Sequence, residues 1–252
     1  EHAFGTDPST DLVFPADAGP AAELASTVFG TLTVTRSPDG SGAQRVHLRA
    51  APDVTVLAGE TPIEEMELVS DAHEDTTYLE VEPYRFFVIE RSGRTYLRVL
   101  DRSLPGRLPR PDIRHFPVDA SWRVEARFDP YDPPRTIPVP TILDVDQESV
   151  SPGALVFEGD GVEHRLDAID SGDDLFIILG DRTNGHETYG GGRYVYTDLA
   201  DDQGRIVLDL NRAYNPPCVF TDYATCPLPP RQNRLPLRVE AGEKMVEGYV
   251  DH

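Results

Sequence analysis

The chain has 252 residues and a formal net charge of -21, with 44 Asp and Glu against 23 Lys and Arg. This length is enough for one large domain or for two modest domains that each bury a core, and we expect two. A charge of this sign repels phosphate backbones and anionic membrane surfaces, and no compensating basic run occurs along the chain. Binding to nucleic acid or to a membrane is therefore not expected.

Of the 23 basic residues, 22 are arginines, and Lys244 is the single lysine. Dense carboxylates hold water and counterions, and arginine is less strongly hydrated than lysine and pairs with carboxylates in a fork. Adaptation to a salt-rich cytoplasm explains both the excess of carboxylates and the preference for arginine over lysine. The alternative explanation is a GC-rich genome, in which the codons for these residues are common. Two cysteines are too few for a disulfide scaffold, which favours a reduced, cytoplasmic location. No apolar run is long enough to cross a membrane. The sequence leaves open whether a leader peptide upstream of Glu1 has been removed.

Short β-type runs separated by turn residues fill most of the chain. The 23 prolines argue against long helices, so we expect an all-β protein with at most a helical turn or two near residues 21–26 or in loops. Glycine-containing turns are expected to join neighbouring runs into hairpins. The expected strands are 30–36, 45–49, 84–89, 95–100, 154–157, 162–168, 174–179, 193–198, 205–210 and 235–240.

Two of these runs make specific predictions about burial. Alternation in the first hairpin predicts that Leu32, Val34, Val46 and Leu48 face inward. The run 174–179 is continuously apolar, as in a strand that is covered on both faces.

A series of polar, glycine-rich and proline-rich motifs in the second half of the chain resembles the domain of unknown function family 1684. The motifs are Arg114–Asp119, Trp122–Phe128, Pro133–Pro138, Asp181–Arg193, Asp209–Cys218, Cys226–Pro230, Asn233–Leu235 and Ala241–Lys244. The resemblance is strongest over Arg114–Lys244, and we expect it to cover the whole chain. It implies a mostly β fold and brings no activity or substrate with it.

The first hundred residues resemble a forkhead-associated β-sandwich. The resemblance is carried by Phe4–Phe14, a strand near Phe29, Val54–Gly59 and Phe86–Ile89. That family reads phosphothreonine with an arginine after its first glycine and with a Ser-Arg-x-x-His loop. Here Thr6 follows Gly5, and 19–22 is Gly-Pro-Ala-Ala, so the reading residues are missing. The resemblance therefore implies a structural or docking sandwich.

We accordingly expect two domains, separated near the Pro-rich segment Arg102–Pro111. Residues 1–103 would form the forkhead-associated-like β-sandwich. Residues 104–252 would form the family 1684 domain, an antiparallel β-barrel or sandwich with a long Pro-rich loop.

Candidate ligand-binding residues gather in the second domain. Tyr189 and Arg193 flank a run of three glycines that lacks the spacing and the following helix of a nucleotide-binding loop. Arg193 could clamp a ligand carboxylate or phosphate, or pair internally with Asp181 or Asp209. Asn211 and Asn215 lie where prolines end strand pairing, so their amides need other partners. We predict that Tyr189, Arg193, Asn211, Asn215 and Lys244 converge in space.

The remaining reactive residue types give weaker signals. The spacing of Cys218 and Cys226 does not match that of zinc-binding cysteines. The sequence leaves open whether they are buried structural thiols, form a disulfide or include a nucleophile. His186 reads as an exposed turn residue, and His115 and His164 lie in strand-like segments, where histidines are mostly structural. No metal site, cofactor site or catalytic residue is predicted.

Two classes of function follow. In the first, the five candidate residues line a polar pocket of a small-molecule binding or hydrolytic module. In the second, the same residues are a fold lock, meaning a set of contacts that fixes the tail of the chain onto the domain. The protein would then be a non-catalytic structural protein or would bind a protein partner through its first domain. The absence of a Ser-His-Asp arrangement or a cofactor fingerprint weighs against the first class.

Overall fold

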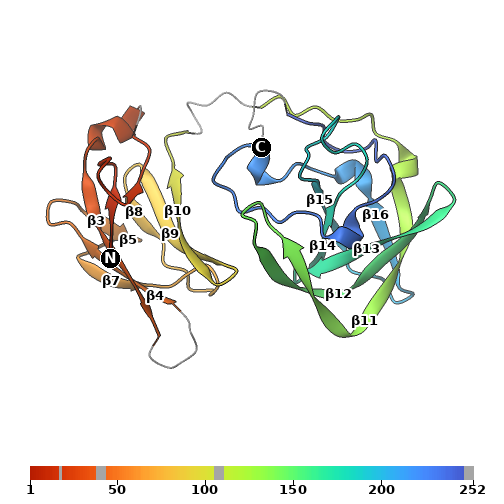
Figure 1. Ribbon diagram of the computed structural model, residues 1–252, viewed down its shortest axis with the longest axis horizontal. Coiled ribbons are helices and arrows are strands. Elements are labelled where there is room, and N and C mark those ends of the chain that lie inside the picture. Colours follow the sequence, from red (N-terminus) through yellow and green to blue (C-terminus); the bar gives the residue numbers. More distant parts are fainter. Residues whose placement is uncertain (17–18, 38–43, 105–110, 247–252) are drawn as a thin grey trace. The chain divides into compact units, whose positions relative to one another are not determined.

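The computed structural model describes residues 1–16, 19–37, 44–104 and 111–246. The described residues form strands and short 3-10 helices and contain no α-helix, which confirms the predicted all-β class. The chain folds as two compact units, Glu1–Pro109 and Arg110–His252, drawn in Figure 1 from red to yellow and from green to blue. Among the described residues, no helix has the length and apolar character needed to cross a membrane.

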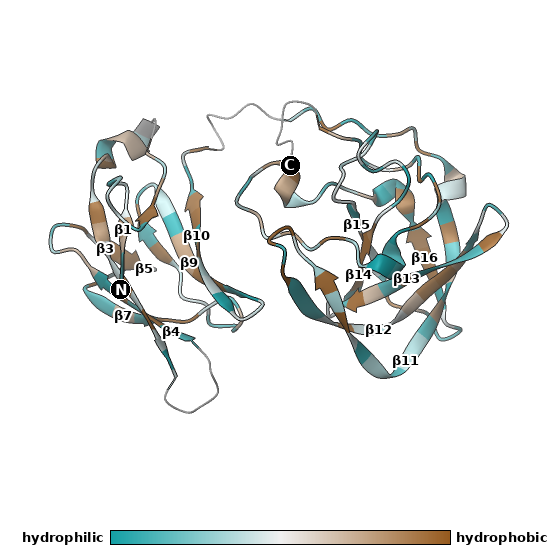
Figure 2. Ribbon diagram, in the orientation of Figure 1, coloured by the Kyte–Doolittle hydropathy of each residue, from teal (hydrophilic) through white to brown (hydrophobic). Residues whose placement is uncertain are grey.

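The first unit is a β-sandwich of two five-stranded sheets, β2-β1-β3-β4-β7 and β10-β9-β8-β5-β6. Its elements are β1 (His2–Gly5), β2 (Leu12–Val13), η1 (Gly19–Leu24), β3 (Val28–Arg36), β4 (Gln44–Ala50), β5 (Val56–Ala58), β6 (Thr61–Ile63), β7 (Glu65–Leu68), β8 (Leu79–Val81), β9 (Tyr84–Arg91) and β10 (Arg94–Asp101). Figure 2 shows hydrophobic segments on strands of both units, as expected for sheets that each turn one face to a core.

The hairpin of β3 and β4 follows the predicted register, with one correction. Leu32, Val46 and Leu48 are buried in the sandwich core. Val34, which we predicted to face inward, is 39% exposed. It lies opposite Val46 near the turn end of the hairpin, where the last three residues of β3 are all exposed. The turn that joins these strands falls on residues 38–43, outside the described residues.

The second unit contains a six-stranded antiparallel sheet in the order β15-β14-β13-β12-β11-β16. Its elements are η3 (Ala120–Trp122), β11 (Arg123–Pro140), β12 (Asp146–Gly159), β13 (Val162–Asp170), β14 (Asp174–Leu179), β15 (Arg193–Asp198), β16 (Arg205–Asp209), η4 (Leu210–Arg212), η5 (Pro217–Val219) and η6 (Arg231–Asn233). The end strands approach each other, since the Thr197 hydroxyl of β15 donates to the Val207 carbonyl of β16 at 2.9 Å. The sheet is thus a nearly closed barrel (Figure 1).

Two strand predictions in this unit were wrong in detail. Runs 193–198 and 205–210 were expected to pair as a hairpin, but β16 pairs with β11 instead. Run 235–240 was expected to be a strand, but it forms no ladder and bends at residues 236 and 237. The expected linker falls mostly on residues 105–110, outside the described residues.

The predicted two-sided burial of 174–179 is confirmed in β14. Ile177 points into the barrel core, whereas Ile178 points outward into a second apolar cluster. This outer cluster also contains Tyr194, Cys218 and Cys226. Because the outer face of β14 is apolar, the proline-rich loop after β16 packs over it.

Candidate functional site

Arg193 is the most deeply buried charged residue of the predicted site. It begins β15, and alternation along that strand places Arg193, Val195 and Thr197 on the buried side. Its side chain and that of Asp181 are both 0% exposed, and Arg193 Nη2 lies 2.8 Å from Asp181 Oδ2. The internal pairing that the sequence left open as an alternative is therefore present.

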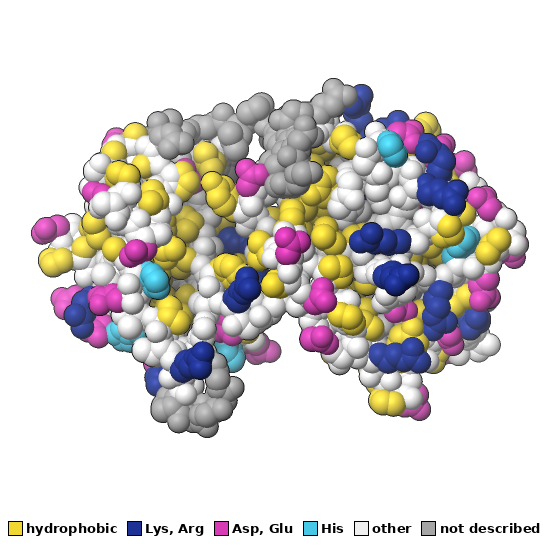
Figure 3. Space-filling model, viewed as in Figure 1, with side chains coloured by type: hydrophobic (Ala, Val, Ile, Leu, Met, Phe, Trp, Pro, Cys, Tyr) yellow, Lys and Arg dark blue, Asp and Glu magenta, His cyan; other side chains and the backbone are white. Residues whose placement is uncertain are grey.

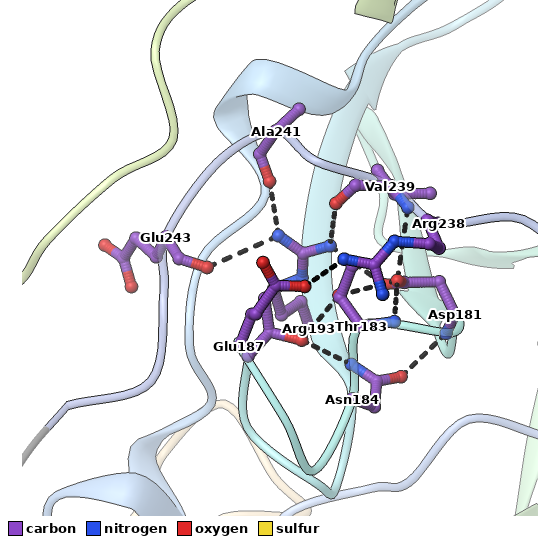
Figure 4. Close-up of polar contacts among 10 residues, drawn as sticks. Asp181, Thr183, Asn184, Glu187, Arg193, Arg238, Val239, Ala241 and Glu243 are labelled. Atoms are coloured by element: carbon purple, nitrogen blue, oxygen red, sulfur yellow. Dashed lines mark hydrogen bonds and ion pairs between the residues drawn. The ribbon is translucent and has the colours of Figure 1, made fainter.

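Both Nη atoms of the Arg193 guanidinium also bind the tail of the chain, a name we use for residues 235–245. Nη2 donates to the Val239 carbonyl at 2.9 Å, and Nη1 donates to the carbonyls of Ala241 and Glu243. Figure 4 shows the guanidinium aimed at these three carbonyl groups. One side chain thus joins the start of β15 to the tail, three of whose carbonyl groups accept hydrogen bonds from it.

The carboxylate of Asp181 is fixed by the turn that follows β14. Its Oδ1 accepts from the Thr183 amide at 2.7 Å, from the Thr183 hydroxyl at 2.6 Å and from the Val239 amide at 3.2 Å. Asn184 Oδ1 in turn accepts from the Asp181 amide at 2.6 Å. Such side chain to backbone bonds are how Asp, Asn and Thr shape tight turns. The pair is therefore held rigidly from both sides.

The tail continues between two other segments of the unit. On one side, the Phe116 amide donates to the Gly242 carbonyl at 2.9 Å, and the Lys244 amide donates to the Arg114 carbonyl at 2.7 Å. On the other side, the Glu243 amide donates to the Ala213 carbonyl at 2.8 Å. The tail therefore connects the beginning of the second unit to its last strands.

Asn215 and Lys244 meet on this same tail. Asn215 Nδ2 donates to the Lys244 carbonyl at 2.9 Å, and the Asn215 amide donates to Glu243 Oε2 at 2.7 Å. The Lys244 ammonium lies 4.3 Å from the centre of the Phe116 ring, a cation–π contact. The structure thus brings Arg193, Asn215 and Lys244 to one segment.

Asn211 and Tyr189 make their contacts elsewhere. Asn211 Oδ1 accepts from the Asp119 amide at 3.0 Å, and its Nδ2 donates to the Asp119 carbonyl at 2.9 Å. The Tyr189 hydroxyl lies 3.5 Å from Cys218 Sγ, and burial raises the pKa of this tyrosine. The contacts of these two residues are therefore not with the tail.

The cysteines and histidines lie in ordinary structural surroundings. Cys218 and Cys226 are buried and carry no disulfide. His164 is buried, and its Nε2 lies 3.1 Å from the Gly159 carbonyl oxygen. His115 Nε2 lies 3.9 Å from Glu243 Oε1, and His186 is exposed. Within the described ranges, no group of three or more His, Cys, Asp or Glu is arranged to hold a metal ion.

Two contributors to the site escaped the sequence prediction. Glu243 binds the Asn215 amide through its carboxylate and Arg193 through its carbonyl group. Asn233 bridges two strands, because its Oδ1 accepts from the Asp167 amide at 2.7 Å and its Nδ2 donates to the carbonyls of Asp167 and Ile178. The only indication for Asn233 was its place in the motif Asn233–Leu235, and the neighbouring sequence does not indicate its hydrogen-bond partners.

A cleft of about 500 Å³ opens on the second unit away from these residues. It lies where β11 and β12 separate, next to the turn that precedes β16. Its charged and amide side chains are Glu125, Arg127, Glu158, Glu163, Gln203 and Arg205. None of the five predicted ligand-binding residues lines it.

The fold and the buried pair define a class, an all-β protein whose barrel-like unit is held by its own C-terminal segment. The chain belongs to the family described as Protein of unknown function (DUF1684), whose model matches residues 111–244. We expected this family over the whole chain, and the match spans the second unit.

Comparison with solved structures found an uncharacterized protein of Haloarcula marismortui, determined by NMR in solution. It is 33% identical, and the alignment covers 52% of this chain and 75% of that chain with a TM-score of 0.45. A search of curated proteins found no match.

Proposed function

We propose that the Arg193 motif is a fold lock, and that the protein is a non-catalytic one that binds a protein partner through its first unit. The first part of this proposal rests on one observation: Arg193 pairs with Asp181, and both side chains are 0% exposed. A ligand cannot reach a guanidinium that is enclosed in this way without opening the domain. The further donation of Arg193 to three tail carbonyls also favours a structural role.

The physical chemistry of such a pair supports this reading. Two buried charges give up their hydration, and they are tolerated only when mutual attraction and further hydrogen bonds compensate. Here Asp181 accepts from Thr183 and Val239, and Arg193 donates to the tail, so both ions have several partners. Breaking the pair leaves an uncompensated buried charge, whereas its presence fixes the position of the tail.

The first part is tested by Arg193→Ala, with Arg182→Ala as a matched control in the same segment. Arg182 is exposed. If Arg193 is a fold lock, Arg193→Ala leaves the buried charge of Asp181 uncompensated and lowers the free energy of unfolding by about 3 kcal/mol. Trp122 is the single tryptophan and packs against the barrel core, so its fluorescence reports on the second unit.

The two classes of function give opposite results in this experiment. In a lock, Arg182→Ala unfolds like the wild type, and Arg193→Ala unfolds at a clearly lower urea concentration. If Arg193 instead holds a ligand, its removal leaves stability nearly unchanged. A carboxylate or phosphate compound that stabilises the wild type would then lose its effect in Arg193→Ala. That second pattern would overturn the lock.

The outer face of β9 and β10 supports the second part of the proposal. Tyr84, Phe86 and Val88 point into the sandwich core, so the alternate residues of β9 and their partners on β10 lie on the opposite face. This outer face, which we call the aromatic–arginine face, consists of Arg85, Phe87 and Ile89 of β9, Tyr96, Arg98 and Leu100 of β10, and Tyr78, whose ring packs against Phe87. Aromatic residues and arginine are the types enriched at the centres of protein interfaces.

The contacts within the aromatic–arginine face prepare it for an acidic partner. The rings of Tyr78 and Phe87 lie 4.9 Å apart, and the Arg85 guanidinium lies 4.2 Å over the Tyr78 ring. Tyr78 and Leu100 are 41% and 44% exposed. Exposed apolar area beside arginines fits a partner that offers carboxylates around an apolar centre.

The partner is sought by capture on the immobilised full chain, comparing the wild type with Arg98→Glu and Leu100→Glu. The matched control is Val118→Glu, because Val118 is 87% exposed in the second unit. A species that binds the wild type and Val118→Glu, but neither variant of the face, supports the proposal. Equal capture by all four proteins would reject this face as the binding surface.

A second candidate function is small-molecule binding in the cleft beside β11 and β16. Its volume lies within the range typical of ligand sites. Arg127 and Arg205 are opposite each other across the two strands, and Gln203 adds an amide. An anionic compound that raises the unfolding temperature of the wild type but not of Arg205→Ala would favour this candidate function.

A further inference from the structure

The two cysteines of the chain are neighbours in the cluster outside the barrel. Cys218 is 0% exposed and Cys226 is 4% exposed. The Cys218 amide donates to Cys226 Sγ at 3.2 Å, which places the second sulfur directly against the backbone of the first cysteine. Proximity of this kind, at a separation of eight positions in the chain, meets the first requirement for a disulfide.

Each cysteine is held by backbone contacts that are independent of the other. Cys218 is the middle residue of η5, a turn closed by the bond from the Phe220 amide to the Pro217 carbonyl at 2.9 Å. The Cys226 carbonyl accepts from the Ile142 amide at 3.0 Å, just beyond the end of β11. The approach of the Cys226 sulfur to Cys218 is therefore imposed by the fold.

We propose that Cys218 and Cys226 are a modification site at which an intramolecular disulfide closes the loop between them. The oxidant is a small-molecule disulfide. A thiolate of the pair attacks one sulfur of this molecule and expels the first small thiolate. The other cysteine, as thiolate, attacks the protein sulfur of the mixed disulfide and expels the second small thiolate. Two protein thiols lose their protons, two small thiols are released, and the protein gains one S–S bond.

The surroundings make the reduced pair slow to react and the bridged pair slow to open. Contact with the Cys226 thiol and burial raise the pKa of Cys218, so little thiolate is present at neutral pH. Because thiolate is the reacting species, bridging should accelerate as the pH rises. Once formed, the bond lies within the outer apolar cluster, where small thiols have little access.

Bridging would also change the neighbourhood of Tyr189. In the reduced protein, the Cys218 thiol lies 3.5 Å from the Tyr189 hydroxyl and can donate to it. A disulfide sulfur has no proton to donate, so this donation ends. The loop that carries the three glycines would then be released from one contact while the proline-rich loop is tightened.

The test treats the folded full chain with glutathione disulfide at increasing ratios to glutathione. Thiols are counted after denaturation, and the mass is measured on the intact chain and on peptides. We expect the loss of both thiols together, a peptide that joins Cys218 to Cys226, and reversal by dithiothreitol. The bridged form should unfold at a temperature higher by roughly 5 °C. Cys218→Ser and Cys226→Ser should instead keep their thiol or acquire one glutathione.

Other outcomes would overturn the proposal. They are retention of both thiols by the folded wild type at a large excess of glutathione disulfide, one glutathione on each cysteine, or a bond between chains. Tyr189→Phe is the matched control, because it removes the phenol that contacts Cys218 and leaves both thiols in place. It should still form the bridge, and failure to do so would likewise count against the pair as the site.

Discussion

The three glycines before β15 differ in what their backbone positions require. Gly192 has φ +86°, and a side chain there would meet Pro229 Cγ at 2.4 Å and the Leu179 carbonyl oxygen at 2.7 Å. A Cβ on Gly190 would lie no closer than 3.8 Å to another atom. The run therefore turns the chain tightly under the proline-rich loop and into Arg193. Glycine is required at Gly192, whereas Gly190 has room for a side chain.

Gly192→Ala should destabilise the second unit by about 2 kcal/mol or more, because it combines a strained φ with a backbone clash. Gly190→Ala is the matched control and should change stability by less than about 0.5 kcal/mol. Urea unfolding followed by Trp122 fluorescence measures both. Similar stability of the two variants would contradict the assigned role of Gly192.

At the level of elements, the tail explains why one predicted strand is absent. Leu235, Leu237, Val239 and Ala241 alternate into the barrel core, so the period of two was interpreted correctly. The tail lacks a ladder because its backbone groups bond to the Arg193 side chain and to the backbone of loop residues such as Gly180 and Ala213. Sequence alternation reports which face a residue turns to the core, and it does not report where the backbone finds its partners.

Hairpins were predictable where the turn determines the partner. Gly93 adopts φ +72° and joins β9 to β10 in the expected register. Gly204 also has a positive φ, yet β15 and β16 form no ladder and meet through the Thr197 hydroxyl, because the ladder partner of β16 is β11. Local chemistry thus predicted the turns, whereas the pairing of β16 depended on contacts distant in the chain.

The candidate site was predictable in composition and less so in arrangement. The pairing of Arg193 with Asp181 was among the alternatives that the sequence left open, because an acidic residue lay within the same motif. The place of Asn211 at Asp119 was not foreseeable, since these residues are 92 positions apart. A Glu that contributes both its carboxylate and its carbonyl group, as Glu243 does, has no local signature.

The outer cluster predicts a loss of stability at alkaline pH. Burial raises the pKa of Tyr194, and burial with the nearby Tyr196 raises the pKa of Tyr214 to about 12. A phenol whose folded-state pKa is raised stabilises the fold fully below its unfolded-state pKa of about 10. This contribution is lost as the pH rises from about 10 toward the folded-state pKa.

We therefore expect the urea midpoint of the second unit to be flat from pH 8 to about 9.5 and to fall from about pH 10 upward. Tyr194→Phe cannot ionise at this position and also loses the bond from its hydroxyl to the Pro227 carbonyl. It should start lower at pH 8 and fall less steeply. A wild-type midpoint unchanged up to pH 11.5 would show that these phenols are not held neutral by the fold.

At the scale of the whole molecule, the net charge of -21 is the dominant property. On the face shown in Figure 3, acidic and basic side chains are interspersed, and several arginines form exposed pairs such as Arg205 with Asp201 at 2.8 Å. Exposed pairs contribute little each, so the excess of carboxylates is expected to leave net repulsion in dilute buffer. This is the physical basis for proposing a salt-loving protein.

Thermal midpoints should accordingly rise with potassium chloride from dilute buffer to molar salt, because the screening length shrinks to about 3 Å at 1 M. Sodium chloride at equal ionic strength separates screening from effects specific to one cation. Sucrose tests for stabilisation without charge. A midpoint that stays level across the salt series would remove the argument for salt adaptation.

The tail contacts also have a consequence for protein synthesis. Carbonyl groups at 239, 241 and 243 accept hydrogen bonds from Arg193, and the Lys244 amide binds the Arg114 carbonyl near the start of the second unit. A nascent chain grows from its N-terminus, so the first unit can fold while the second is still being made. The second unit must wait with Arg193 lacking its three carbonyl partners and with Asp181 lacking the Val239 amide. Its folding on the ribosome is therefore coupled to the emergence of residues 239–245, and a prematurely ended chain carries an exposed, unfinished barrel.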